Sequence, residues 1–209
     1  DADVVGLLEI ENDNPTKTAE LGPDYALESI IAKLNEGIAQ QPDGSPLYNY
    51  IATGTIGTDA IKVGIIYRTT NVSPIGNFAT IDASVDPRFD STKNRPALAM
   101  SFKDFHTGEI FTLAVNHLKS KGCPGPNDPP TNPLDLDQLD GQSCWNPTRV
   151  SAAEALVDWL EQDPTKAGSN KYLIMGDLNS YAKEDPIDAI KLGSDGIAGT
   201  ADDYVDMVA

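Results

Sequence analysis

The chain has 209 residues and carries 15 Lys and Arg against 32 Asp and Glu, which gives a formal net charge of −17. Hydrophobic residues make up 40% of the chain and charged residues 22%, a usage that excludes a disordered chain, a coiled coil and a collagen-like fibre. No apolar run approaches the roughly 20 residues of a membrane span, and the acidic balance excludes nucleic-acid binding through a general basic field. Any polyanionic substrate would have to be met by local positive charge.

Strand and helix patterns begin at the first residues, and they do not alternate regularly. The run at 3–10 (DVVGLLEI) is short and apolar, as is typical of a strand buried on both faces. Residues 24–36 carry apolar side chains at helical spacing and end at a glycine. Five strand-like runs follow, with a turn at His106 between the last two. They lie at 47–53, 60–68, 71–81, 97–102 and 109–118.

The second half contains fewer elements and a long irregular stretch. A Pro-rich stretch at 119–147 is followed by an amphipathic helix at 148–161. A strand that runs into a loop follows at 171–180, then a short helix at 185–192 and a Gly/Asp-rich tail at 193–203. There is no internal repeat and no linker. The order predicts one α+β domain over 1–209, in which a mixed sheet or sandwich has helices packed outside.

Cys123 and Cys144 lie on one loop crowded with Pro, Gly, Asn and Asp. Two cysteines in this setting indicate a disulfide and hence an oxidising compartment, the alternative being two unrelated thiols. The bridge would close a loop of about 22 residues.

Glu9 stands inside an apolar run, where an ionised carboxylate is costly to bury unless it is paired or bound to a metal. Strand alternation places Leu7, Glu9 and Glu11 on one face. Glu9 is either a ligand for a hard cation such as Mg²⁺ or a solvent-facing residue at the end of the strand.

Two further groups of polar residues follow apolar strands. Asp177 and Asn179 come directly after YLIM, and an acid with an amide at this spacing could orient a water molecule, although both residue types also begin turns. His117 and Lys119 end the strand EIFTLAV and form a plausible phosphate-contacting pair. Positive charges near strand or helix ends complete the set, and each could equally be a surface charge: Arg68, Arg95, Lys121 and Arg149.

Six motifs follow one another along the chain: LLEIEN, VGIIYR, NRPALA, NHLKSKGC, DGQSCWNPTR with AAEALVDWL, and YLIMGDLNSY. Together they resemble the endonuclease/exonuclease/phosphatase superfamily, with its deoxyribonuclease I-like fold, and within it the secreted bacterial extracellular nucleases. The resemblance runs from residue 3 to about 192. It implies a four-layer α/β sandwich and hydrolysis of phosphate esters with Mg²⁺ or Mn²⁺.

The resemblance also implies roles for individual residues. Glu9 matches the metal-binding Glu, and His117 matches the position that contacts the scissile phosphate. Asp177 and Asn179 match the pair that orients the attacking water and the phosphate. Substrate contacts are implied for three residues, with the last two less closely matched: Arg95, Lys119 and Arg149.

The chain also departs from the family pattern. A first strand with an Asn, and later strands with an Asp and a terminal Asp-His pair, have no counterpart here, and no histidine follows His117. We therefore expect a fragment of a larger secreted bacterial enzyme, incomplete at both ends and nearly inactive by itself.

The expected function is extracellular hydrolysis of nucleic acid, DNA or possibly RNA, without a membrane or protein partner. The alternatives are a phosphatase or phospholipid phosphodiesterase of the same fold, and a non-catalytic module that binds Ca²⁺ through Asp195 and Asp202 in the acidic tail.

Overall fold

A computed structural model of the chain describes residues 2–12, 22, 24–37, 41–125 and 129–207. The chain forms two compact units. The first comprises 1–80, 96–116 and 163–176, and the second comprises 81–95, 117–162 and 177–209.

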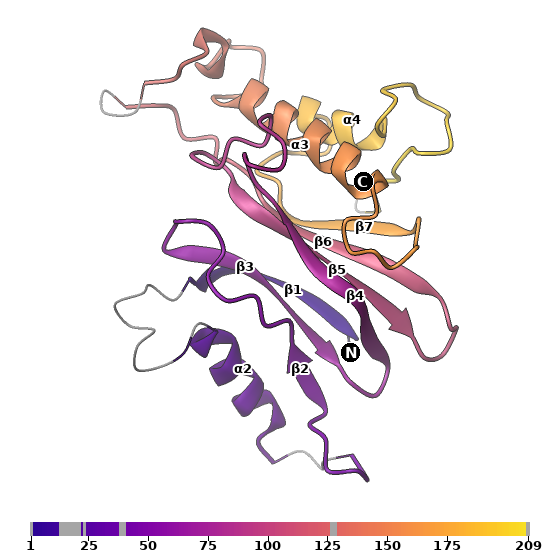
Figure 1. Cartoon of the computed structure of the whole chain (residues 1–209). Coiled ribbons are helices and arrows are strands. Elements are labelled where there is room, and N and C mark those ends of the chain that lie inside the picture. Colours follow the sequence, from indigo (N-terminus) through magenta and orange to yellow (C-terminus); the bar gives the residue numbers. More distant parts are fainter. Residues whose placement is uncertain (1, 13–21, 23, 38–40, 126–128, 208–209) are drawn as a thin grey trace. The chain divides into compact units, whose positions relative to one another are not determined.

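The first unit contains a three-stranded antiparallel sheet in the order β1-β3-β2, formed by Val4–Glu11, Ile61–Arg68 and Tyr48–Tyr50 (Figure 1). Helix α2 (Tyr25–Asn35) covers one face of this sheet. Its buried residues Leu27 and Ile31 pack against Ile66 of β3. The helical spacing of the apolar residues in α2 therefore serves one interface with the sheet.

The first unit also contains most of a four-stranded sheet in the order β4-β5-β6-β7 (Figure 1). Its strands are Val72–Ile81, Arg95–Asp104, Ile110–His117 and Tyr172–Asp177. Strands β4 to β6 follow one another as hairpins. Strand β7 runs parallel to β6, because the backbone N–H groups of Thr112 and Leu118 donate to Lys171 and Asp177, a constant offset along both strands.

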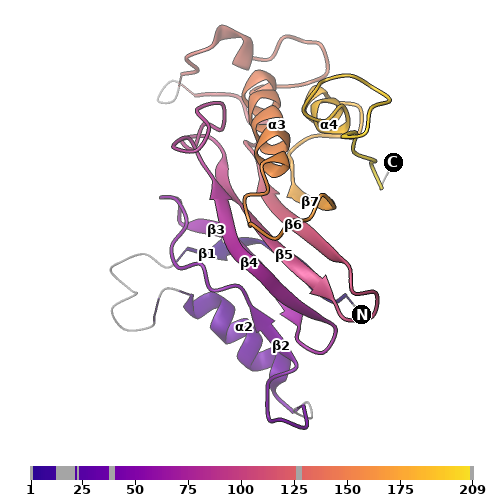
Figure 2. The ribbon, with the colours of Figure 1, turned by 45° about the vertical axis from the view of Figure 1, so that its right-hand side comes forward.

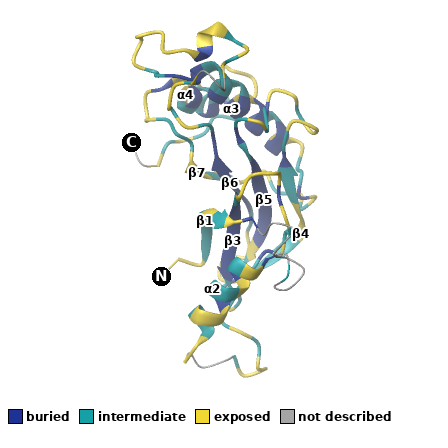
Figure 3. Ribbon diagram, turned by 90° about the vertical axis from the view of Figure 1, so that its left-hand side faces the viewer, coloured by how far each residue is buried: buried dark blue, intermediate teal, exposed yellow. Residues whose placement is uncertain are grey.

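The main core lies between these two sheets. Strands β3, β5 and β6 each direct alternate apolar side chains into it, and Figure 3 shows β5 and β6 buried over most of their length. The cluster comprises Ile51, Ile56, Val63, Ile65, Tyr67, Val72, Leu98, Met100, Phe102, Leu113 and Val115. The α+β class and the predicted sandwich of sheets are thereby confirmed.

The second unit contains helix α3 (Asn146–Glu161), which lies between β6 and β7 in sequence, and helix α4 (Asp185–Lys191), which follows β7. The 3₁₀ turn Pro133–Asp135 precedes α3, and α4 lies beside α3 (Figures 1 and 2). Each helix and strand expected from the sequence is present, with boundaries that differ by a few residues. Among the described residues, no helix is both long and apolar enough to cross a bilayer.

A buried ion pair joins α2 to the first sheet. Lys62 of β3 and Asp24, which precedes α2, are 2% and 4% exposed, and the Lys62 ammonium lies 2.7 Å from the Asp24 carboxylate. Both side chains also bond to the backbone of Gly54. Lys62 Nζ donates to the Gly54 carbonyl, and the Gly54 N–H donates to Asp24 Oδ2. The two buried side chains therefore neutralise each other's charge, and both form hydrogen bonds with the backbone of Gly54.

We expect Asp24→Ala to lower the free energy of unfolding by about 3–5 kcal/mol, because it leaves the Lys62 ammonium buried without a carboxylate. Urea denaturation followed by circular dichroism measures this. The matched control is Glu36→Ala, which breaks an exposed ion pair with Lys33 and should cost less than about 1 kcal/mol. Equal effects of the two variants would contradict this role of Asp24.

Candidate active site

The parallel pairing of β6 and β7 places their carboxyl ends at the same edge of the sheet. His117 is the last residue of β6, and Asp177 is the last residue of β7. The N–H of Leu118 donates to the Asp177 carbonyl at 2.9 Å, and Asn179 Nδ2 donates to the Leu118 carbonyl at 2.9 Å. The two polar motifs of the sequence, NHLK and GDLN, are therefore side by side, and His117, Asp177 and Asn179 belong to the second unit.

Within this pair of motifs the functional groups lie close together. His117 Nε2 is 3.8 Å from Asp177 Oδ2, and the His117 side chain is 6% exposed while that of Asp177 is 47% exposed. Asp177 Oδ1 accepts from the Asn179 N–H at 2.9 Å. Asn179 has φ +47°, a left-handed conformation that Asn tolerates better than most residues. A nearly buried imidazole thus lies beside an accessible carboxylate.

The glycine of the GDLN motif, Gly176, is required by the close approach of two strands. Its φ is +127°, and a Cβ at this position would meet the backbone of Asn116. The Asn116 side chain also donates to the Met175 carbonyl at 3.2 Å. Close approach of β7 to β6 therefore requires glycine immediately before Asp177.

The start of β5 reaches the same edge, because β5 is antiparallel to β6. Asn94 is buried, and its Oδ1 accepts from the Lys119 N–H at 2.9 Å. Arg95 begins β5 and is half-buried. The backbone of Arg95 and of Lys119 therefore lies at the edge that holds His117.

Lysine side chains gather on aromatic rings in the second unit. Lys93 and Lys119 place their ammonium groups 4.7 Å and 5.2 Å from the Trp145 ring centroid. Lys121 Nζ lies 3.8 Å from the centroid of the Tyr181 ring. Sequence reasoning missed Lys93 and Tyr181. Their only signal is proximity along the chain, since Lys93 comes two residues before Arg95 and Tyr181 two residues after Asn179.

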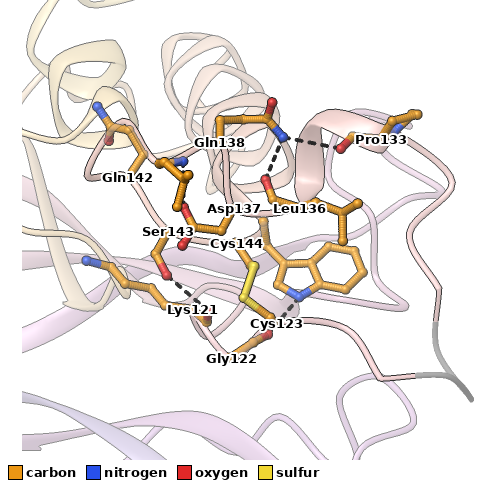
Figure 4. The surroundings of a disulfide bond; sticks show 12 residues. Lys121, Gly122, Cys123, Pro133, Leu136, Asp137, Gln138, Gln142, Ser143 and Cys144 are labelled. Carbon is orange, nitrogen blue, oxygen red and sulfur yellow. Dashed lines mark hydrogen bonds between the residues drawn. A yellow bond between two sulfur atoms is a disulfide. The ribbon is translucent and has the colours of Figure 1, made fainter.

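The predicted disulfide between Cys123 and Cys144 is present, with the two Cα atoms 5.1 Å apart (Figure 4). Neighbouring hydrogen bonds support the same loop: the indole N–H of Trp145 donates to the Gly122 carbonyl at 2.9 Å. Ser143 Oγ donates to the Lys121 carbonyl at 3.4 Å (Figure 4). The bridge therefore holds the segment that carries Lys119 and Lys121.

Arg149 does not suit the substrate contact predicted for it. Its side chain is completely buried, and the guanidinium donates to the carbonyls of Cys144, Gln142 and Lys119 at 2.8, 3.0 and 3.3 Å. Burial lowers the pKa of the guanidinium from its usual value. Arg149 holds the loop against the start of α3, and its geometry corrects the sequence-based expectation.

Glu9 belongs to the first unit, whereas His117, Asp177 and Asn179 belong to the second. Glu9 is exposed and has φ +54°, a strained conformation for a residue with a side chain. It sits in a β-bulge, where the register between β1 and β3 shifts. Such strain is often retained at functional positions.

The bulge also corrects one expectation about β1. Leu7 packs with Ile10 on the α2 side of the sheet, and Leu8 packs on the opposite side, against the main core. Simple alternation would put Leu7 and Ile10 on opposite faces, so it does not hold across the bulge, which adds a residue.

The acidic tail turns several of its oxygen atoms toward its own loop. Asp202 accepts from Thr200 Oγ1 at 2.7 Å and from the Asp195 N–H at 3.0 Å. The hydrogen bond from Thr200 is the main cause that lowers the pKa of Asp202 to about 2. Within the described parts of the chain, no group of three or more His, Cys, Asp or Glu side chains is placed to hold a metal ion.

No protein-family model and no curated protein matches this chain. Solved structures do match. The human Nocturnin catalytic domain aligns with a TM-score of 0.55 and 14% identity, over 93% of this chain and 57% of its own. An endonuclease/exonuclease/phosphatase from Bacteroides vulgatus aligns with a TM-score of 0.53 and 16% identity, over 91% and 57%. ANGEL2, a 2′,3′-cyclic phosphatase, aligns with a TM-score of 0.51 and 17% identity, over 91% and 43%.

This chain has the endonuclease/exonuclease/phosphatase fold. The resemblance seen in the sequence is thereby confirmed at the level of the fold. Of these structures, one is named as an endonuclease/exonuclease/phosphatase and one as a 2′,3′-cyclic phosphatase. The chain spans between 43% and 57% of the length of these three structures.

Arg149→Met should lower the free energy of unfolding by at least about 2 kcal/mol, because three carbonyl groups lose a buried donor. Lys119→Met, a change at the other weakly matched position, should stay within about 0.5 kcal/mol, since Lys119 is only partly buried. Chemical denaturation measures the free energy of unfolding of both variants. A large loss for Arg149→Met with a small one for Lys119→Met indicates that Arg149 holds the loop. A neutral Arg149→Met would contradict the structural role.

The double substitution Cys123→Ser/Cys144→Ser should lower the free energy of unfolding by about 3 kcal/mol, the chain-entropy term for a loop of about 22 residues. Thermal and urea denaturation, with and without reductant, measure this. Reductant should reproduce the effect in the natural protein and leave the double variant unchanged. Reductant-insensitive stability of the natural protein would show that the bridge does not stabilise the loop.

Proposed function

We propose that this chain forms most of the catalytic domain of a secreted, metal-dependent nuclease that hydrolyses phosphodiester bonds, with DNA as the principal substrate and RNA as a possible one. One observation carries the proposal: the β6–β7 pairing brings His117, Asp177 and Asn179 together at one edge of the sheet. The fold, and the resemblance of the sequence to secreted bacterial nucleases, agree with it.

The chemistry follows from the environment of each group. Asp177 is accessible and can accept a hydrogen bond from an attacking water, which orients the water and draws off its proton. His117, beside it and nearly buried, can donate a hydrogen bond to a phosphate oxygen when protonated. Asn179 uses its amide N–H on Leu118, which leaves the amide oxygen to contact water or a cation.

The residues suit a hard divalent cation by donor type. Glu9 supplies an exposed carboxylate on a strained bulge, and carboxylate oxygen is the ligand that Mg²⁺ and Mn²⁺ prefer. Such an ion, when bound, neutralises negative charge that develops on the phosphate. We propose Glu9 as the protein ligand, together with substrate oxygens. The alternative is Ca²⁺ binding by the acidic tail, with Asp195 and Asp202 as the residues to change.

Local positive charge supports a polyanionic substrate despite the net charge of −17. Lys93 and Lys119 lie on the Trp145 ring, and the Lys119 backbone is bonded to Asn94, next to Arg95. A phosphate flanking the cleaved one can be met by these ammonium and guanidinium groups. A substrate with a single phosphate has less use for so extended a group of cations, so a nuclease is favoured over a phosphatase of the same fold.

We further propose that the protein is extracellular and bacterial. The Cys123–Cys144 disulfide supports an oxidising compartment, because structural disulfides persist there and are rare in the reducing cytosol.

Asp177→Asn should reduce the rate of cleavage by about 10²–10⁴, because the amide cannot accept a proton from water. Plasmid nicking by the natural polypeptide that contains these residues, with Mg²⁺ and with EDTA, measures the rate. The matched control is Asp188→Asn, an exposed carboxylate on α4 that should leave the rate unchanged. An unchanged rate for Asp177→Asn would return Asp177 to the role of a turn residue, and hydrolysis of p-nitrophenyl phosphate without nicking would favour the phosphatase.

A further inference from the structure

Tyr181 is an exposed aromatic residue beside the proposed active site. It comes four residues after Asp177 and two after Asn179, in the same compact unit. It is 77% exposed. Single exposed aromatic residues are common on protein surfaces, so exposure alone does not indicate a ligand. The surroundings of Tyr181 are more informative.

A buried carboxylate holds Tyr181 in place. Glu184 is 7% exposed, and its Oε2 accepts from the Tyr181 N–H at 3.1 Å. The Glu184 N–H donates in return to the Tyr181 carbonyl at 2.9 Å. The other carboxylate oxygen, Oε1, accepts from Lys121 Nζ at 2.5 Å. One buried side chain thus positions both the backbone of Tyr181 and the ammonium of Lys121.

Lys121 in turn fixes the ring. Its ammonium lies over the Tyr181 ring at 3.8 Å from the centroid, in a cation–π contact. Its backbone is two residues from Cys123, and its carbonyl accepts from Ser143. Because the ammonium covers one face of a ring that is 77% exposed, the opposite face is open to solution. The ring is a preorganised flat surface, which lowers the entropy lost when a ligand stacks on it.

We propose that the open face of Tyr181 stacks a nucleobase of the substrate next to the phosphate that is cut. This inference rests on the proposed nuclease function and specifies how the substrate is recognised. A base stacked on an exposed aromatic ring is held without regard to sequence, because every base has a flat π-face. The charge of Lys121 is already balanced by Glu184, so this subsite reads the base.

The test is equilibrium binding of a fluorescently labelled single-stranded oligonucleotide, followed by anisotropy in EDTA so that no cleavage occurs. Tyr181→Ala should weaken binding by about 5-fold to 100-fold, the range for loss of one stacked base, and Tyr181→Phe should bind like the natural protein. The matched control is Phe105→Ala, which removes another exposed aromatic residue, from the turn between β5 and β6. It should have no effect.

A second probe separates stacking from charge. An abasic strand of the same length keeps the phosphates and lacks the bases. The natural protein should bind the abasic strand about as weakly as Tyr181→Ala does, and Tyr181→Ala should not weaken abasic binding further. If oligonucleotide binding and plasmid nicking persist but Tyr181→Ala binds both strands like the natural protein, the stacking inference is overturned alone. If the natural protein neither binds nor cleaves nucleic acid, the proposed function falls with it.

Discussion

The parallel pairing of β6 with β7 is the constraint on which the candidate site depends. Parallel strands end at the same edge of a sheet, so residues 60 positions apart in sequence, His117 and Asp177, become neighbours. The pairing depends on Gly176, because a side chain there would meet the backbone of Asn116. A crossover through the loop and α3 makes this parallel arrangement possible, since parallel strands need a long connection. The site is thus a consequence of topology before it is one of side-chain chemistry.

The irregular segment between β6 and α3 is ordered by contacts that differ in kind. The disulfide closes its ends, Arg149 donates to three of its carbonyls, and Asp135 accepts from the backbone and side chain of Thr148. Leu134, Leu136 and Leu139 of this loop are exposed, so hydrogen bonds and the covalent link take the place of the hydrophobic packing that orders the sheets. The same contacts hold Lys119 and Lys121 beside aromatic rings. A strongly acidic chain thereby presents a confined group of cations.

Buried charged side chains are stabilised in two different ways in the molecule. Lys62 and Asp24 pair in the first unit, and Arg149 in the second bonds only to carbonyl groups. Neither arrangement is signalled by residue type, since charged residues are usually exposed. The sequence-based assignment of Arg149 to substrate binding failed for this reason. A charged residue at the start of an amphipathic helix looks exposed until the loop that covers it is in place.

The sequence by itself determined the order of strands and helices, the α+β class and the disulfide, because periodicity, turn residues and cysteine context are local signals. It also pointed to His117, Asp177 and Asn179 as polar residues that end apolar strands. Only the tertiary structure decided that β7 pairs in parallel with β6, that a bulge at Glu9 changes the faces of β1, and that Tyr181 meets Lys121. These features depend on contacts between residues that are distant in sequence, and a local sequence pattern does not contain the energies of such contacts.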